Sequence, residues 1–451
     1  MKPASADPTP PPLTQWLTSL PVLSPSGGED WQALCERLMP DLQATAEACG
    51  LFERFQTLVR ACDLLRLLVG YALHDVSLRE MSFWAGETLD LDVTDEALRV
   101  KFHRSLDWLA LLLSRLLRPV EGDRLESPSA RVRFCLIDAT MLAFAGSKGA
   151  EWRLHLTYGH ETACMEGLEL TTVKSPEALH RCRAEAFDIP IGDRAYGLAK
   201  HYHHGVEQNL YPLVRVHVSN LRLADTNAQV MKPADLLQKA EHGEVDLDVL
   251  VLLEGKAQPG RLVWSAMPAE AAARARQALR QRAKKEGYAP SELGLALAGW
   301  VVLLTRLPRE HFSAALVRRL YRQRWQIELF FKRCRQLLGL GVKKKLSPRL
   351  AQVVVLTKML VVALLQRSQP MLFCRPAEGE ERWLWRWTRV LLLSLTSVVF
   401  AVFSEGWQRW IGKLAERGRK RRRSEHDLPL FREAVEGWVA SWPQPAAPGL
   451  P

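Results

Sequence analysis

The sequence predicts a mixed α/β protein in which a strand-rich middle lies between helical N-terminal and C-terminal regions. Apolar residues recur with helical spacing over residues 31–119. At residue 132 the period changes, and short apolar or alternating runs bounded by turn residues continue as far as residue 305. Long apolar and tryptophan-rich helical stretches begin at residue 348. We therefore expect an α/β core flanked on both sides by helices.

Composition and charge limit the class of protein. A chain of 451 residues has room for two to four domains, and 47% hydrophobic with 25% charged residues is ordinary for a soluble protein. The net charge of +11 favours a polyanionic partner, nucleic acid first and an anionic membrane surface second. Basic residues cluster at 343–345 and 417–423. The eight scattered cysteines form no C-x-x-C pair, which indicates free thiols in a reducing cytoplasm.

The N-terminal region is predicted to contain a tail and a helical domain. Residues 1–29 are rich in Pro, Ser and Gly and are expected to be poorly ordered. Within the helical domain, 30–128, Ser77 and Glu80 have the spacing of a capping box, and Thr94 is placed to begin another helix. This domain fits a DNA-binding module and an ordinary packing domain about equally well.

No segment is predicted to cross a membrane. The N-terminus lacks the pattern of a signal peptide. The apolar stretches 351–365 and 390–403 are shorter than a membrane span requires, and the first contains Gln352 and Lys358. We read both as buried helices and expect a soluble, cytoplasmic protein.

Two predicted strands each deliver an aspartate. The strand 132–137 ends at Asp138, a turn at 146–149 leads into a returning strand 152–158, and 168–173 is a third strand. A helix is then expected to open at 175–177 with Pro in its first turn. The short apolar run 189–192 ends at Asp193. Catalytic groups of α/β sheets gather at such strand ends, although Asp188, ahead of the run, competes with Asp193 for this role.

Further strands are predicted at 213–218, 245–253, 261–265 and 300–305, with a basic helix at 269–286. The histidines at 201, 203 and 204 lie on a helix, where adjacent side chains point in different directions. We expect them to form a surface cluster rather than a metal site.

One stretch without Pro or Gly, 320–335, is predicted to form a helix with two distinct sides. At about 100° per residue its apolar side chains share one side. These are Leu320, Ile327, Phe331, Cys334 and Leu338. An adjacent arc holds a carboxylate among cations and a phenol. These are Tyr321, Arg324, Glu328, Lys332 and Arg335. The alternative is a surface helix with Arg/Glu pairs at helical spacing.

Asp138, Asp193 and Glu328 together suit phosphoryl transfer with two metal ions. Such a site holds two divalent ions roughly 3.5–4 Å apart, one activating the attacking oxygen and one stabilising the leaving oxygen. Carboxylate oxygens without nearby His or Cys favour Mg²⁺ or Mn²⁺ over zinc. We therefore predict two such ions per active site.

Four short motifs occur in the order LIDAT at 136–140, WRLH at 152–155, GDRAY at 192–196 and Y-x2-R-x3-E at 321–328. In combination they resemble a bacterial insertion-sequence DDE transposase of the cut-and-paste group with a Tyr-Arg-Glu-Lys signature. The resemblance implies an RNase H-like catalytic core at 129–368 carrying a β-rich insertion at about 210–299. A helical domain would precede the core, and a helical region with a basic run, 369–451, would follow it.

The resemblance also implies roles for single residues. Asp138, Asp193 and Glu328 match the metal-binding triad, and the remaining matches are DNA contacts. These are Tyr321, Arg324, Lys332, Arg335, Arg194 and Trp300, the last beside a flipped base. Arg335 stands where the signature has Lys, so its planar fork would grip phosphate with a different geometry. Trp300 is open to a second reading, as a core residue at the start of an apolar strand.

The expected function is that of a DNA transposase. It would bind the inverted-repeat ends of its element, cleave them by metal-dependent hydrolysis and join the 3′-OH ends to target DNA. Relatives imply a hairpin intermediate and a homodimer in the synaptic complex. The alternatives are a catalytically silent DNA-binding derivative and an RNase H-like nuclease without strand transfer.

Overall fold

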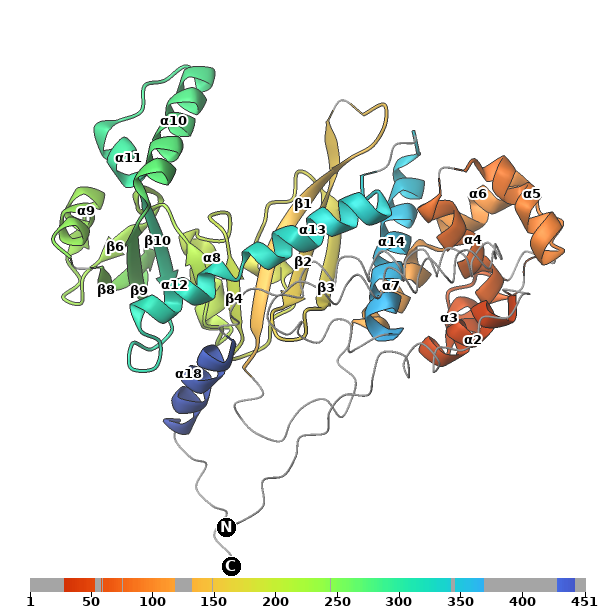
Figure 1. The fold of residues 1–451 in the computed structure, drawn as a ribbon, viewed down its shortest axis with the longest axis horizontal. Coiled ribbons are helices and arrows are strands. Elements are labelled where there is room, and N and C mark those ends of the chain that lie inside the picture. The colour runs from red at the N-terminus through yellow and green to blue at the C-terminus, as the bar shows by residue number, and fades with distance from the viewer. Residues whose placement is uncertain are drawn as a thin grey trace, which may run out of the picture. The chain divides into compact units, whose positions relative to one another are not determined.

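The computed structural model describes residues 28–52, 58, 60–74, 76–117, 132–147, 149–243, 245–341, 345–368 and 428–442. These residues belong to two compact units, one helical and one built on a sheet (Figure 1). Residues 1–27 of the expected tail, all of 369–427, and the basic residues 343, 344 and 417–423 lie outside the described residues, whereas residues 28 and 29 of that tail already belong to a helix.

The helical unit contains the N-terminal helices and α14. Its helices are α2 (Gly28–Leu38), α3 (Leu42–Ala48), α4 (Ala61–Leu73), α5 (Leu78–Leu89), α6 (Asp95–Arg104), α7 (Leu106–Leu116) and α14 (Pro348–Ser368). The predicted caps are confirmed. Ser77 and Glu80 form a reciprocal capping box at α5, and the Thr94 side chain accepts from the backbone N–H of Ala97 at α6.

Helix α14 is the central packing helix of this unit. By length and composition it could cross a membrane, with a mean hydropathy of 1.7 over Pro348–Gln366, but 83% of that stretch is buried inside the protein. It packs against α7, α4 and α6, and Lys358 Nζ donates to the backbone oxygen of Gly339 at 2.8 Å. The prediction of a buried helix is confirmed. Its partners are the N-terminal helices.

The second unit is built on one ten-stranded sheet, so the prediction of a mixed α/β protein is confirmed. Its strands are β1 (Phe134–Ala143), β2 (Ala150–Gly159), β3 (Met165–Thr172), β4 (Ile189–Gly192), β5 (Leu213–Arg215), β6 (Arg222–Ala224), β7 (Val230–Met231), β8 (Asp246–Leu253), β9 (Lys256–Ala266) and β10 (Trp300–Thr305). They lie in the order β3-β2-β1-β4-β5-β10-β9-β8-β6-β7. β1, β4 and β5 are parallel, and every other neighbouring pair is antiparallel.

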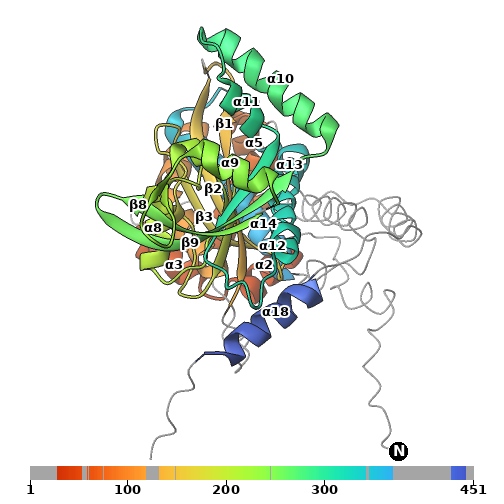
Figure 2. The same cartoon turned by 90° about the vertical axis from the view of Figure 1, so that its left-hand side faces the viewer.

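The helices and short 3-10 turns of this unit connect or cover the strands. They are η2 (Leu179–Arg181), α8 (Ala199–Glu207), η3 (Val218–Asn220), α9 (Pro233–Glu241), α10 (Ala269–Glu286), α11 (Glu292–Leu297), α12 (Ala314–Arg322), α13 (Trp325–Leu338) and α18 (Leu428–Ala440). Helices α12 and α13 follow one another across the sheet, and α10 with α11 projects beyond the ends of β9 and β10 (Figures 1 and 2).

Three predicted strand and helix boundaries in this unit differ from the structure. Strand β1 continues through Asp138 to Ala143, because its partner β2 stays paired along that length. The helix expected from residue 175 is only the short turn η2, which leaves 173–178 as a loop. The single helix expected over 320–335 is interrupted at residues 323–324, between α12 and α13.

The buried side of the predicted helix at 320–335 is confirmed despite the interruption. Leu320, Ile327, Phe331, Cys334 and Leu338 are all buried. The Phe330 ring lies 5.3 Å from that of Tyr158, which brings α13 against β2.

The histidine prediction was wrong. His201 and His203 are buried on α8, and His203 Nε2 lies 2.8 Å from the backbone oxygen of Val251. They serve the packing of α8 against β8, because both side chains face the core rather than solvent.

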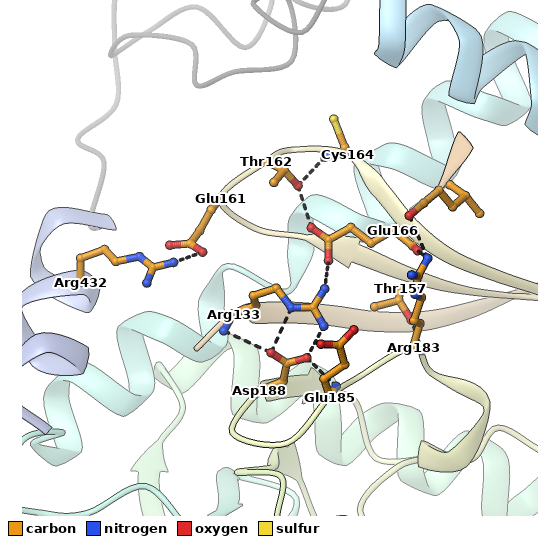
Figure 3. Close-up of polar contacts among 11 residues, drawn as sticks. Arg133, Thr157, Glu161, Thr162, Cys164, Glu166, Arg183, Glu185, Asp188 and Arg432 are labelled. Carbon is orange, nitrogen blue, oxygen red and sulfur yellow. Dashed lines mark hydrogen bonds and ion pairs between the residues drawn. The ribbon is translucent and has the colours of Figure 1, made fainter. Parts of the chain in front are cut away.

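Helix α18, in the C-terminal part of the described chain, packs against the rest of the sheet unit. The ring of Trp438 stands edge-on to Tyr211 at 4.3 Å, and Trp442 lies 4.6 Å from Phe187. Arg432 forms an ion pair with Glu161, at the turn after β2 (Figure 3).

Candidate active site

Parallel pairing of β1 with β4 brings Asp138 and Asp193 to the same place in the sheet. In this ladder Leu136 is the partner of Ile191. Each aspartate lies two residues beyond its partner position, so both side chains reach the same face and the same level of the two strands. The shared register explains why residues 55 positions apart in sequence meet.

Backbone hydrogen bonds orient both carboxylates. Asp138 Oδ1 accepts from the Ala139 N–H at 2.8 Å, and Asp193 Oδ1 accepts from the Ala195 N–H at 2.8 Å. The turn after Asp193 is held close to the sheet, since a Cβ on Gly197 would come within 2.2 Å of the backbone oxygen of Arg215. A side chain at Gly197 would therefore push this turn, and Asp193 with it, away from β5.

The structure adds a third acid that sequence reasoning missed. Carboxylate oxygens of Asp138, Glu177 and Asp193 lie within 4.8 Å of one another. The sequence predicts Glu177 to lie in the first turn of a helix, but it lies in the loop between β3 and η2, which brings it beside Asp138 of β1. The sequence feature that could have identified Glu177 is a Pro-Glu pair just after a strand. Its position in the sequence alone does not show that the loop brings Glu177 to the other acids.

This concentration of acids changes their protonation. Burial raises the pKa of Asp138 to about 7; the Ala139 hydrogen bond and Arg324 lower that pKa, and Asp193 and Glu177 raise it. Burial, followed by the charge of Asp193, raises the pKa of Glu177, while Arg153 lowers it. Acids whose ionisation is opposed by burial and by each other favour a bound cation, which would relieve both costs.

Glu328 lies outside this group of three acids. Its side chain is 54% exposed on α13, and its Oε1 accepts a hydrogen bond from Arg324 Nη2. Arg324 Nη1 lies 3.6 Å from Asp138 Oδ2. The expected triad is therefore only partly brought together: Asp138 and Asp193 meet directly, and Glu328 is connected to Asp138 through the Arg324 guanidinium.

The expected DNA contacts have different environments. Tyr321 is half-buried, and burial raises its pKa. Arg335 donates to Thr140 Oγ1, two residues beyond Asp138 on β1, while Lys332 is exposed on the same helix. Arg194 is exposed beside Asp193.

Trp300 packs against the sheet core. Its ring lies edge-on to Trp264 at 5.9 Å, and the residue is only half-buried. The geometry fits the packing reading and leaves part of the ring open.

Asp188 has a structural role instead of the competing catalytic one. It is fully buried, and its Oδ2 lies 2.5 Å from Arg133 Nη2 and accepts from the Glu185 N–H at 2.7 Å (Figure 3). Arg133 also contacts Glu166 at 3.4 Å. With its oxygens taken up by these donors, Asp188 is not part of the group of three acids.

The model of the transposase DDE domain matches residues 131–364, just over half of the chain. The chain belongs to the DDE transposase family. Two curated relatives are insertion-sequence proteins of Escherichia coli. The putative transposase InsL of IS186A and the transposase of IS421 are each 29% identical, over 75% of this chain and 93% of their own length.

A solved structure, the piggyBac transposase synaptic complex with hairpin DNA, covers 89% of this chain and 86% of its own at 10% identity. Its TM-score is 0.36, and a similarity that low supports no conclusion about this chain.

Family membership fits the geometry of the site. DDE transposases are DNA-cleaving enzymes that use divalent metals, and the family implies an RNase H-like core. The five strands β3-β2-β1-β4-β5 are the part of the sheet that carries the acids. Among the described residues, the group formed by Asp138, Glu177 and Asp193 offers carboxylate oxygens without His or Cys, a donor set that suits Mg²⁺ or Mn²⁺.

Proposed function

We propose that this protein is an active DNA transposase that cleaves the inverted-repeat ends of its own insertion sequence and joins the 3′-OH ends to target DNA. The observation that carries the proposal is the meeting of Asp138 and Asp193 on neighbouring parallel strands, within the residues that match the DDE domain. Cytoplasmic action on DNA near the nucleoid fits the insertion-sequence relatives.

Asp138, Asp193 and Glu328 are the proposed catalytic residues. Two Mg²⁺ or Mn²⁺ ions held there would activate the attacking oxygen and stabilise the leaving oxygen. Asp138 and Asp193 are fixed by backbone hydrogen bonds and form the rigid part of the site. Glu328 is on a different element and has an exposed side chain, so it can complete the site when DNA draws Arg324 away.

Cations and aromatic groups around the acids would hold the DNA. Tyr321 and Arg324 are assigned to the phosphates nearest the cleaved bond, and this is the role of the Tyr-Arg-Glu-Lys signature. Arg335, Lys332 and Arg194 are assigned to flanking phosphates, since each cation stands on or beside an element that carries an acid. The half-open ring of Trp300 is assigned to a base displaced near the transposon end.

The remaining parts of the chain have proposed roles in assembly. The N-terminal helices, proposed as the DNA-binding domain, would read the inverted repeats. A homodimer would pair the two ends in the synaptic complex, because two cleavages must be joined to one target. The basic residues at 343–345 and 417–423 would add phosphate contacts.

Cleavage and joining assays test the proposal against its two rivals. Purified protein is incubated with DNA that bears the ends of its element, in Mg²⁺ or Mn²⁺, and nicks are mapped. Pre-cleaved ends are then supplied with a target plasmid. Binding without nicks would indicate a silent DNA-binding derivative, and nicks without joined products would indicate a nuclease without strand transfer.

A further inference from the structure

We propose that Glu177 is a further carboxylate of the metal site and that it lets the protein bind a divalent cation before DNA arrives. This inference rests on the proposed function, because it concerns the same site. The group of oxygens within 4.8 Å of one another contains Glu177 and not Glu328. In the DNA-free protein, the third acid of the site is thus contributed by the loop after β3.

Arg153 fixes the loop that carries Glu177. It extends from β2, where it pairs with Met141 and Thr171 in the neighbouring strands. Its Nη1 donates to the backbone oxygen of Ser175 at 2.6 Å, two residues before Glu177. The Arg153 side chain is only 12% exposed, so it holds the loop from inside the protein. We regard Arg153 as a positioning residue for Glu177.

An ion pair with Arg153 does not explain why the Glu177 carboxylate lies close to two other carboxylates. Arg153 Nε lies 3.9 Å from Glu177 Oε1, too far for a hydrogen bond, and that buried Nε has no hydrogen-bond partner in the described part of the chain. A carboxylate that is 19% exposed and held near two others pays for desolvation and repulsion. A cation coordinated by the three acids would offset both effects.

The number of ligands that Mg²⁺ requires also supports metal binding by these three acids without DNA. Mg²⁺ takes six oxygen ligands and retains several waters, so one to three carboxylates suffice to bind it. Asp138, Asp193 and Glu177 supply three from rigidly held segments. Glu328 is paired with Arg324 in the DNA-free protein. It would join the metal site later, together with a DNA phosphate. Glu177 therefore contributes to the metal affinity of the DNA-free protein, whereas Glu328 is needed for cleavage once DNA is bound.

Mn²⁺ binding to the DNA-free protein tests this division. Glu177→Gln should weaken Mn²⁺ binding by about tenfold or more, and Arg153→Gln should weaken it less. Glu151→Gln, an exposed glutamate of β2, is the matched control and should leave binding unchanged. Titration calorimetry or the Mn²⁺ spin-resonance signal supplies the affinities, and circular dichroism with thermal unfolding confirms that each variant folds.

Two results would overturn the inference: Mn²⁺ affinity of Glu177→Gln equal to that of the parent, or a parent protein that binds no Mn²⁺ without DNA. Failure of the proposed function looks different, because it is a parent protein that does not cleave end-bearing DNA. Loss of Mn²⁺ binding in Glu177→Gln, with a parent that binds Mn²⁺ but cuts nothing, would keep the metal site and reject the transposase activity.

Discussion

The Arg324 guanidinium stands between Asp138 and Glu328, with Nη1 3.6 Å from Asp138 Oδ2 and Nη2 bonded to Glu328 Oε1. The guanidinium therefore connects two of the three expected catalytic acids, which are carried by different elements. The interruption between α12 and α13 makes the position possible, because Arg324 lies in the break.

Arg324 should therefore matter far more than its neighbours on the same surface. Arg324→Gln removes the cation that we assign to the phosphates nearest the cleaved bond, where charged hydrogen bonds are worth about 1.5–3 kcal/mol, so we expect cleavage to fall by about 10- to 100-fold. Arg324→Lys should recover little, since an ammonium group acts as a point charge and cannot bind a phosphate through two parallel hydrogen bonds as the planar guanidinium does. The exposed Arg322 is the control, and Arg322→Gln should cleave normally. Equal losses in the Arg322 and Arg324 variants would count against a special role for Arg324.

The raised pKa of Asp138 predicts a pH-dependent stability in the absence of metal. Its pKa is about 7 in the folded protein against an ordinary value of 3.8. Between these two pH values the folded state binds more protons than the unfolded state, so the free energy of unfolding falls as pH rises. Asp138→Asn removes this contribution. In EDTA, the variant should gain stability relative to the parent at pH 8 but not below pH 4. Urea unfolding measures the difference, and an identical difference at both pH values would refute the assignment.

Asp188 should act on stability and not on the chemistry. Asp188→Asn breaks a buried ion pair and leaves Arg133 without its main partner, which should cost about 3–5 kcal/mol of unfolding free energy. Arg133→Met combined with Asp188→Asn should recover part of that loss, because it removes the unpaired charge and keeps a side-chain acceptor for the Glu185 N–H. Glu96→Gln, in an exposed pair with Arg99, should have no measurable effect. Urea unfolding compares the variants, and a wild-type stability for Asp188→Asn would contradict the structural role.

Substitutions of Trp300 distinguish a packing role from a DNA-binding role. Stacking of a base on an aromatic ring is worth roughly 1–3 kcal/mol. Trp300→Ala should therefore spare first-strand nicking and depress the later double-strand release, whereas Trp300→Phe should keep most of both activities. Thermal unfolding is measured in parallel. If Trp300→Ala does not fold while Trp300→Phe behaves like the parent, the contact with Trp264 is the main role of this residue.

Local pattern predicted much of the sheet unit. The strands around Asp138 and Asp193 and the basic helix at 269–286 were evident because apolar alternation, turn residues and helix formers act over a few neighbouring residues. The meeting of the two aspartates followed from their places on neighbouring strands, although Asp138 lies within β1 and not at its end as expected. The buried side of 320–338 likewise followed from helical spacing.

Long-range features could not be predicted in this way. Glu177 joins the acids because of where a loop crosses the sheet, and Arg153 fixes that loop from another strand. The association of α14 with α7 and α4 depends on packing between segments more than 200 residues apart, for which periodicity carries no information. The break at Arg324 arises in a sequence of good helix formers, where propensity alone predicts continuity.

The most direct test of the account is cleavage of end-bearing DNA by Asp138→Asn, Asp193→Asn and Glu328→Gln in Mg²⁺ or Mn²⁺, with Glu151→Gln as control. Each amide keeps the side-chain volume and removes one negative charge from the site. We predict that cleavage falls by orders of magnitude in all three variants, while binding to end DNA persists or tightens because less negative charge faces the phosphates. Cleavage by all three at the rate of the parent protein would contradict the central claim.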